Sequence, residues 1–78
     1  MENDVLTRQD RGAVAELTMT RPAALNALSD GLLAALGAEF ARLEEDRDTR
    51  VVVLRGAGKA FCAGHDLREM QAGRQAED

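Results

Sequence analysis

The feature of the sequence that most constrains its fold is the apolar run Val51–Leu54, which leads directly into a glycine-rich loop. A short run that is apolar on both faces and rich in β-branched residues is typical of a strand with cover on both sides of its sheet. We therefore predict a central strand over Val51–Arg55. A chain of 78 residues supplies few elements to cover such a strand, so we interpret it as part of something larger.

The loop after this strand contains three glycines within nine positions, Gly56, Gly58 and Gly64. Glycine adopts positive φ without strain and lets a ligand approach the backbone closely. A strand that runs into such a loop and then into a helix often directs backbone N–H groups at an anion. Two familiar phosphate-binding motifs are absent, because alanine follows Gly58-Lys59 where a P-loop needs serine or threonine, and Phe61 occupies the place of a dinucleotide fingerprint's third glycine.

Two strand-like segments open the chain. Val5–Gln9 is predicted as a short strand, and Ala13–Met19 alternates between two sets of side chains with the period of a strand. The residues between them, Asp10–Gly12, are typical of a turn, with the glycine suited to a positive φ. We predict a β-hairpin whose second strand ends before Pro22, because proline cannot donate to a ladder.

The most regular helical pattern runs from about Asp30 to Glu45, and Ser29 or Asp30 offers an N-cap oxygen. Its predicted apolar face consists of Leu32, Leu33, Leu36, Phe40 and Leu43. Gly37 would let another backbone pack closely against the helix. The order strand, helix, strand predicts a right-handed parallel crossover between Ala13–Met19 and Val51–Arg55.

The end of the chain is predicted to hold a short helix, Leu67–Ala72, capped by Asp66, and then a disordered tail over Gly73–Asp78. Under this interpretation the N–H groups of His65 and Leu67 lie near the positive end of the helix dipole. A backbone N–H held there in a dry pocket would form half of an oxyanion hole.

Two side chains of the loop, Cys62 and His65, have nucleophilic or acid–base potential. No third group is placed to orient the imidazole, so a thiol–imidazole pair is not indicated. We interpret Cys62 as a small buried apolar residue and the ring of His65 as a pocket-lining group without a catalytic role.

Charge, the lengths of the apolar runs and the cysteine count argue against several functions. The formal net charge is −4, with acids and bases interspersed, which argues against a nucleic-acid surface. No apolar run approaches the roughly 20 residues that span a bilayer, and the N-terminus lacks the pattern of a signal peptide. Cys62 is the single cysteine, so neither an internal disulfide nor a metal cluster is predicted. A lone thiol favours a reducing, cytoplasmic location.

Two motifs together resemble the enoyl-CoA hydratase/isomerase (crotonase) superfamily. They are Arg21-Pro22-Ala23-Ala24-Leu25-Asn26-Ala27-Leu28 and Phe61-Cys62-Ala63-Gly64-His65-Asp66-Leu67-Arg68-Glu69-Met70. The resemblance covers nearly the whole chain. It implies an α/β fold, with residues 1–78 as the N-terminal part of a single crotonase-like ββα spiral: β-hairpin, long amphipathic helix, central strand and oxyanion loop. It also implies an acyl-CoA thioester substrate, no cofactor beyond that coenzyme A, and assembly as a homotrimer or hexamer.

The resemblance assigns roles to particular residues. The backbone N–H of His65 would supply one oxyanion donor, where most relatives carry alanine or glycine. The residues that would line the groove for the substrate are Ala23, Ala24, Leu25, Ala63, Gly64, His65, Asp66 and Leu67. Relatives often place a basic residue after the proline to reach a CoA phosphate. This chain has alanines there, which leaves Arg21, Arg55 or Lys59 as candidates, with solvated surface charge as the alternative. Asn26 is expected to brace the loop by hydrogen bonds.

The second oxyanion glycine and the acid/base glutamates of the family lie beyond the positions that this sequence matches. None of its candidate carboxylates corresponds to them: Glu39, Glu44, Glu45, Glu69 and Glu77. We therefore interpret the chain as the thioester-binding piece of a longer hydratase- or isomerase-like enzyme, which stabilises an enolate oxyanion. The alternative is a non-catalytic CoA-thioester-binding or assembly module that lacks the acid/base half.

Overall fold

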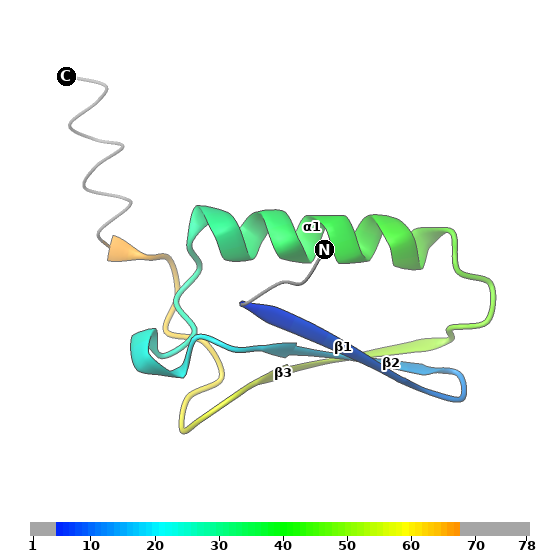
Figure 1. The fold of residues 1–78 in the computed structure, drawn as a ribbon, viewed down its shortest axis with the longest axis horizontal. Helices are drawn as coiled ribbons and strands as arrows, with labels where there is room; N and C mark the ends of the chain where they lie inside the picture. The colour runs from blue at the N-terminus through cyan, green and yellow to red at the C-terminus, as the bar shows by residue number, and fades with distance from the viewer. Residues whose placement is uncertain (1–4, 68–78) are drawn as a thin grey trace, which may run out of the picture.

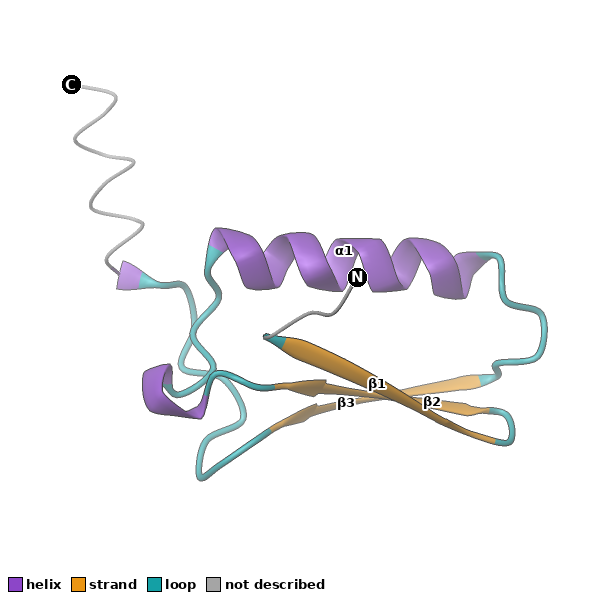
Figure 2. Ribbon diagram, viewed as in Figure 1, coloured by secondary structure: helices purple, strands orange, loops and turns teal. Residues whose placement is uncertain are grey.

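A computed structural model describes residues 5–67 and shows one long helix lying over one face of a small sheet (Figure 1). The elements follow the order β1 (Leu6–Arg11), β2 (Val14–Met19), the 3-10 helix η1 (Pro22–Ala24), α1 (Asp30–Glu44) and β3 (Val51–Gly56). The sheet has the order β1-β2-β3, and α1 connects β2 to β3 (Figure 2). The helix and tail predicted over 67–78 lie outside the described residues, apart from Leu67.

The first two strands form the predicted hairpin. β1 and β2 pair antiparallel from Leu6 opposite Met19 to Arg11 opposite Val14. Gly12 begins the two-residue loop at a φ of 59°. A two-residue loop with glycine at its first position matches the twist of the strands, so pairing continues up to the turn. For this reason β1 ends at Arg11, two residues beyond the predicted Gln9.

The helix α1 begins and ends close to the prediction. Ser29 is the N-cap, and its hydroxyl oxygen accepts a hydrogen bond from the N–H of Leu32 at 3.1 Å. The predicted apolar face is partly wrong, because Leu33 and Phe40 are 45% and 46% exposed. Successive helical residues are rotated by about 100°, which puts these two side chains on a flank of α1, while Leu32 and Leu36 face the sheet.

The core lies between α1 and the sheet face beneath it. Alternate residues of β2 are buried toward the helix, as period-two side-chain direction requires. The core cluster consists of Leu6, Leu17, Met19, Leu32, Ala35 and Leu36. Cys62 is half-buried and packs against this cluster, close to its predicted role as a small apolar residue.

An arginine joins β1, α1 and the turn after the helix. Arg8 contacts Asp10 at 2.9 Å, Glu39 at 3.2 Å and Asp46 at 3.1 Å. These hydrogen bonds raise the pKa of Arg8, and the one to Asp10 has the largest effect. Asp46 in turn accepts hydrogen bonds from the backbone and hydroxyl of Thr49, which lower the pKa of Asp46.

The strand β3 pairs parallel with β2, from Val51 beside Val14 to Gly56 beside Met19, which confirms the predicted parallel crossover. Its predicted cover on both faces is not met within residues 5–67. There β3 is an edge strand, and Val51, Val52 and Val53 are 52%, 41% and 37% exposed. The apolar content of a strand predicts that it is covered but does not specify which element provides the cover.

Candidate functional site

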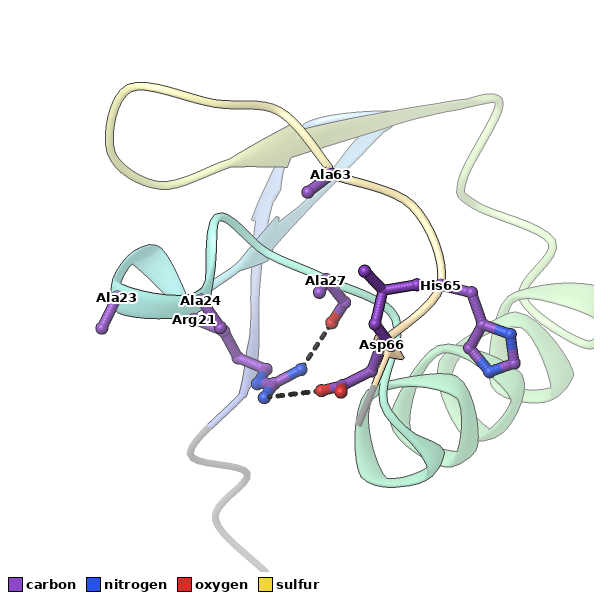
Figure 3. A pocket seen from close by; sticks show the side chains of 8 residues that line it. Arg21, Ala23, Ala24, Ala27, Ala63, His65 and Asp66 are labelled. Atoms are coloured by element: carbon purple, nitrogen blue, oxygen red, sulfur yellow. Dashed lines mark hydrogen bonds and ion pairs between the residues drawn. The ribbon is translucent and has the colours of Figure 1, made fainter. Parts of the chain in front are cut away.

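A cavity of about 440 Å³ opens where the segment after β2 meets the loop after β3. It is lined by Arg21, Ala23, Ala24, Ala27, Ala63, His65, Asp66 and Leu67 (Figure 3). The lining therefore contains six of the eight predicted groove residues. Leu25 and Gly64 do not line the cavity and contribute backbone groups beside it.

Residues 63–66 run alongside residues 25–28 like a short parallel ladder. The N–H of Ala63 donates to the carbonyl oxygen of Leu25 at 2.9 Å, and the N–H of Leu28 donates to that of Gly64 at 2.7 Å. The N–H of Asp66 then donates back to the carbonyl oxygen of Leu28 at 3.0 Å. These bonds bracket His65, which forms an isolated parallel bridge with Leu28.

This pairing leaves the N–H of His65 without a partner among the residues that the structure describes. In a parallel bridge the bracketed residue directs its own N–H and C=O away from the paired strand. The neighbouring N–H of Gly64 donates to the sulfur of Cys62 at 3.4 Å, and those of Ala63 and Asp66 are bonded as above. Within residues 5–67 the N–H of His65 therefore makes no hydrogen bond to protein and can serve an external acceptor.

The imidazole of His65 plays a different part from its backbone. Its side chain is exposed, and Figure 3 shows the ring pointing away from Arg21 and Asp66. No carboxylate that the structure describes bonds the ring, so nothing orients it as a general base. The arrangement favours use of the peptide N–H.

Asn26 braces the two segments, as predicted. It is fully buried and has a φ of 54°, a left-handed conformation that asparagine tolerates. Its Oδ1 accepts a hydrogen bond from the N–H of Arg21 at 2.8 Å. Its Nδ2 donates to the carbonyl oxygens of Ala57 and Ala60, each at 2.9 Å. One side chain thus ties the residues after β2 to the turn after β3.

Glycine is required in that turn. A Cβ on Gly56 would clash with the carbonyl oxygen of Phe61 and lie 2.9 Å from that of Ala60. Gly58 has a φ of 85°, and a Cβ there would lie 3.0 Å from the Cβ of Pro22. The chain therefore reverses tightly after β3 and brings residues 63–66 back beside residues 25–28.

The three candidate cations occupy different places. Arg21 lines the cavity, where its Nη2 lies 3.4 Å from Oδ2 of Asp66 and its Nη1 donates to the carbonyl oxygen of Ala27 at 2.5 Å. Arg55 pairs with Glu16 at 3.4 Å, away from the cavity lining. Lys59 is exposed in the turn and has no ion pair with residues 5–67. Lys59 is thus the candidate that is open to a phosphate.

Sequence reasoning did not foresee two features of the cavity. Ala27 lines it although the groove residues predicted in this segment were only Ala23, Ala24 and Leu25. The guanidinium of Arg21 forms an ion pair with Asp66. Among residues 5–67 no group of three or more histidine, cysteine or acidic side chains could hold a metal ion. Over the same residues, no helix has the length and apolar character to cross a membrane.

Comparison with known proteins identifies relatives of the chain. A profile described as enoyl-CoA hydratase/isomerase matches residues 9–78. The putative enoyl-CoA hydratase EchA13 of Mycobacterium tuberculosis is 52% identical over 58 residues, which are 74% of this chain and 18% of that protein. The mitochondrial 3-hydroxyisobutyryl-CoA hydrolase of Rattus norvegicus is 37% identical over 67 residues, which are 85% of this chain and 17% of that protein.

The fold matches solved structures of the same kind. An enoyl-CoA hydratase from Mycobacterium smegmatis superposes with a TM-score of 0.83 at 55% identity, over 87% of this chain and 27% of that one. The likeness confirms the α/β fold predicted from the two motifs, as an N-terminal portion. The chain spans about a quarter or less of the length of the relatives described here.

Proposed function

The chain belongs to the enoyl-CoA hydratase/isomerase family, and from this premise we propose that it binds an acyl-CoA thioester and stabilises its oxyanion through the N–H of His65. The observation that carries the proposal is the N–H of His65 at the edge of the cavity, which has no partner in the described part of the chain. When a thioester forms an enolate, negative charge grows on the former carbonyl oxygen. A donor that is already aimed at that oxygen stabilises the charge without reorganising.

The short ladder supports this role because it holds the donor still. Three hydrogen bonds to residues 25–28 restrain the peptides on both sides of His65. Rotation of the Gly64–His65 peptide would break the hydrogen bond that the carbonyl oxygen of Gly64 accepts from Leu28. Removing one such donor from an oxyanion hole costs about 10²–10³ in kcat, so a rigid N–H at this place would contribute substantially to catalysis.

The lining of the cavity fits a long, partly apolar ligand. Ala23, Ala24, Ala27 and Ala63 are short side chains that leave room along one wall. Lys59 stands exposed in the nearby turn, where its ammonium could meet a phosphate of coenzyme A. We therefore propose an acyl-CoA as the ligand, consistent with the relatives' names.

The reaction that we favour is addition of water across, or migration of, the double bond of an enoyl-CoA. No glutamate lines the cavity among residues 5–67, so the general acid and base and the second oxyanion donor would come from other residues of the whole protein. That same absence favours the second candidate, a CoA-thioester-binding module without acid/base chemistry. Trimeric or hexameric assembly, a cytoplasmic location and independence from any further cofactor remain predictions.

The test removes the N–H of His65 while keeping the rest of the protein. In the full-length protein, a thioester ligand labelled with ¹³C at its carbonyl should show a lowered C=O stretching frequency when bound. His65→Pro should abolish this shift, while His65→Ala should retain it, because alanine keeps the N–H. Replacing the Gly64–His65 amide by an ester removes the N–H with little change of shape and covers the case in which the proline variant does not fold.

The outcomes separate the two candidate functions. Hydration of crotonyl-CoA together with the shift supports the enzyme, and the shift without turnover supports the binding module. Equal losses from His65→Ala and from the ester would indicate that the imidazole itself participates, and a wild-type protein without any shift would contradict the proposed oxyanion role.

A further inference from the structure

The guanidinium of Arg21 is held within the wall of the cavity. Its side chain is 23% exposed, and that of Asp66, which it contacts at 3.4 Å, is 13% exposed. Figure 3 shows the two groups pointing toward one another, with Nη1 of Arg21 directed at the carbonyl oxygen of Ala27. The guanidinium of Arg21 is therefore already bonded to Asp66 and Ala27, and it is poorly placed to bind a phosphate.

The backbone of Arg21 is fixed as well. Its N–H donates to Oδ1 of Asn26, and its carbonyl oxygen accepts from the N–H of Asn26 at 2.9 Å. Because Asn26 is itself bonded to Ala57 and Ala60, the backbone of Arg21 is tied to the turn after β3.

The position of Asp66 gives this contact its importance. Asp66 follows His65 directly, and its carboxylate lines the same cavity as the proposed oxyanion donor. A negative charge at that place opposes a developing oxyanion, since like charges repel. Among residues 5–67, the cation that lines the cavity is Arg21 and the anion is Asp66.

We propose that Arg21 is a positioning residue for the oxyanion site: it offsets the charge of Asp66 beside the His65 N–H and ties Asp66 to the segment that carries Ala27. This inference rests on the proposed function of the His65 N–H. It assigns Arg21 to catalysis through Asp66, in place of the phosphate contact considered from the sequence.

The experiment compares four variants of the full-length protein with crotonyl-CoA. Arg21→Gln removes the cation and leaves the Asp66 carboxylate, whereas the double variant Arg21→Gln with Asp66→Asn removes both charges. We expect Arg21→Gln to lower kcat about 10- to 100-fold, a smaller loss than that of an oxyanion donor. KM should change little, since the substrate ground state carries no charge on the carbonyl oxygen. The double variant should recover most of the lost kcat.

The control is Arg55→Gln. It deletes another arginine that makes a 3.4 Å ion pair, in that case with Glu16, away from the cavity lining. Its kcat should equal that of wild type. Asp66→Asn alone serves if Arg21→Gln fails to fold, and it should keep at least the wild-type lowering of the bound thioester's C=O frequency.

Three outcomes would overturn the inference. These are an unchanged kcat in Arg21→Gln, a double variant no better than Arg21→Gln, and a loss of the C=O shift in Asp66→Asn. The first two assign Arg21 a merely structural role, because a structural role does not predict rescue by removing its partner. A wild-type protein that shows no shift with bound thioester instead contradicts the proposed function, so the two failures are distinguishable.

Discussion

The Nδ2 of Asn26 donates a hydrogen bond to the carbonyl oxygen of Ala60 at 2.9 Å, across 34 residues of sequence. The same nitrogen bonds Ala57, and Oδ1 of the side chain accepts from Arg21. One buried amide thereby satisfies three backbone groups from two segments. The place of residues 63–66, and with it the place of the His65 N–H, depends on that connection.

Asn26→Ala should destabilise the protein by about 2–4 kcal/mol, because it leaves two carbonyl oxygens and one N–H in the interior without their partner. Chemical denaturation measures the loss. Asn26→Asp keeps the acceptor for Arg21 but loses both donors, so it should also be destabilised. Gln9→Ala, a change on an exposed strand position, is the control and should alter stability little. A stable Asn26→Ala variant would mean that water replaces the amide.

Gly56→Ala and Gly37→Ala form a matched pair of glycine substitutions. The added methyl at Gly56 meets the backbone of Phe61 and Ala60, so we expect a loss of about 1–3 kcal/mol as for other overpacked sites. At Gly37 it meets nothing within 4 Å in residues 5–67, and alanine should stabilise the helix by about 0.5–1 kcal/mol. Thermal unfolding compares the two. Destabilisation by Gly37→Ala in the full-length protein would instead indicate that another segment packs closely there, as the sequence suggested.

Asp46 should make the stability of the protein depend on acid pH. Hydrogen bonds from Thr49 and Asp48 lower the pKa of Asp46 below its ordinary value of 3.8. A group whose pKa is lower in the folded state contributes stability above its unfolded pKa and loses it as pH falls through the folded pKa. Asp46→Asn should therefore be less stable than wild type at neutral pH, and the difference should shrink below pH 3.8.

Denaturant unfolding between neutral and acid pH measures this difference. The control is Asp48→Asn, which removes a carboxylate from the same turn that accepts none of these hydrogen bonds within residues 5–67. A constant gap between wild type and Asp46→Asn across the whole range would show that the carboxylate acts without titrating.

Lys59→Gln tests the proposed contact with coenzyme A. An exposed ion pair with a phosphate contributes about 1 kcal/mol, so KM should rise about fivefold. Because the contact is equal in the ground state and the transition state, kcat should stay unchanged. Steady-state kinetics at two salt concentrations measure both, and Lys59→Arg, which keeps the charge, should resemble wild type. An unaffected KM would mean that Lys59 is a solvated surface charge that does not contact coenzyme A.

Local patterns determined the elements of this protein. The hairpin follows from alternation and from Gly12, and α1 follows from helical spacing and a serine cap, because each signal lies within a few residues of the structure that it specifies. The two motifs likewise indicated the family and six of the residues that line the cavity.

Only the tertiary structure decided which groups are paired. Within residues 5–67 the N–H of His65 is unpaired because its neighbours bond residues 25–28, and Arg21 contacts Asp66 across 45 residues. Which side chains are exposed was also decided by the tertiary structure. Leu33 and Phe40 fit the helical period, yet their side chains are exposed, as are the valines of β3. A sequence pattern states what a side chain or peptide can do, while its partners depend on the chain's path through space. That path is set by distant contacts, foremost those of Asn26.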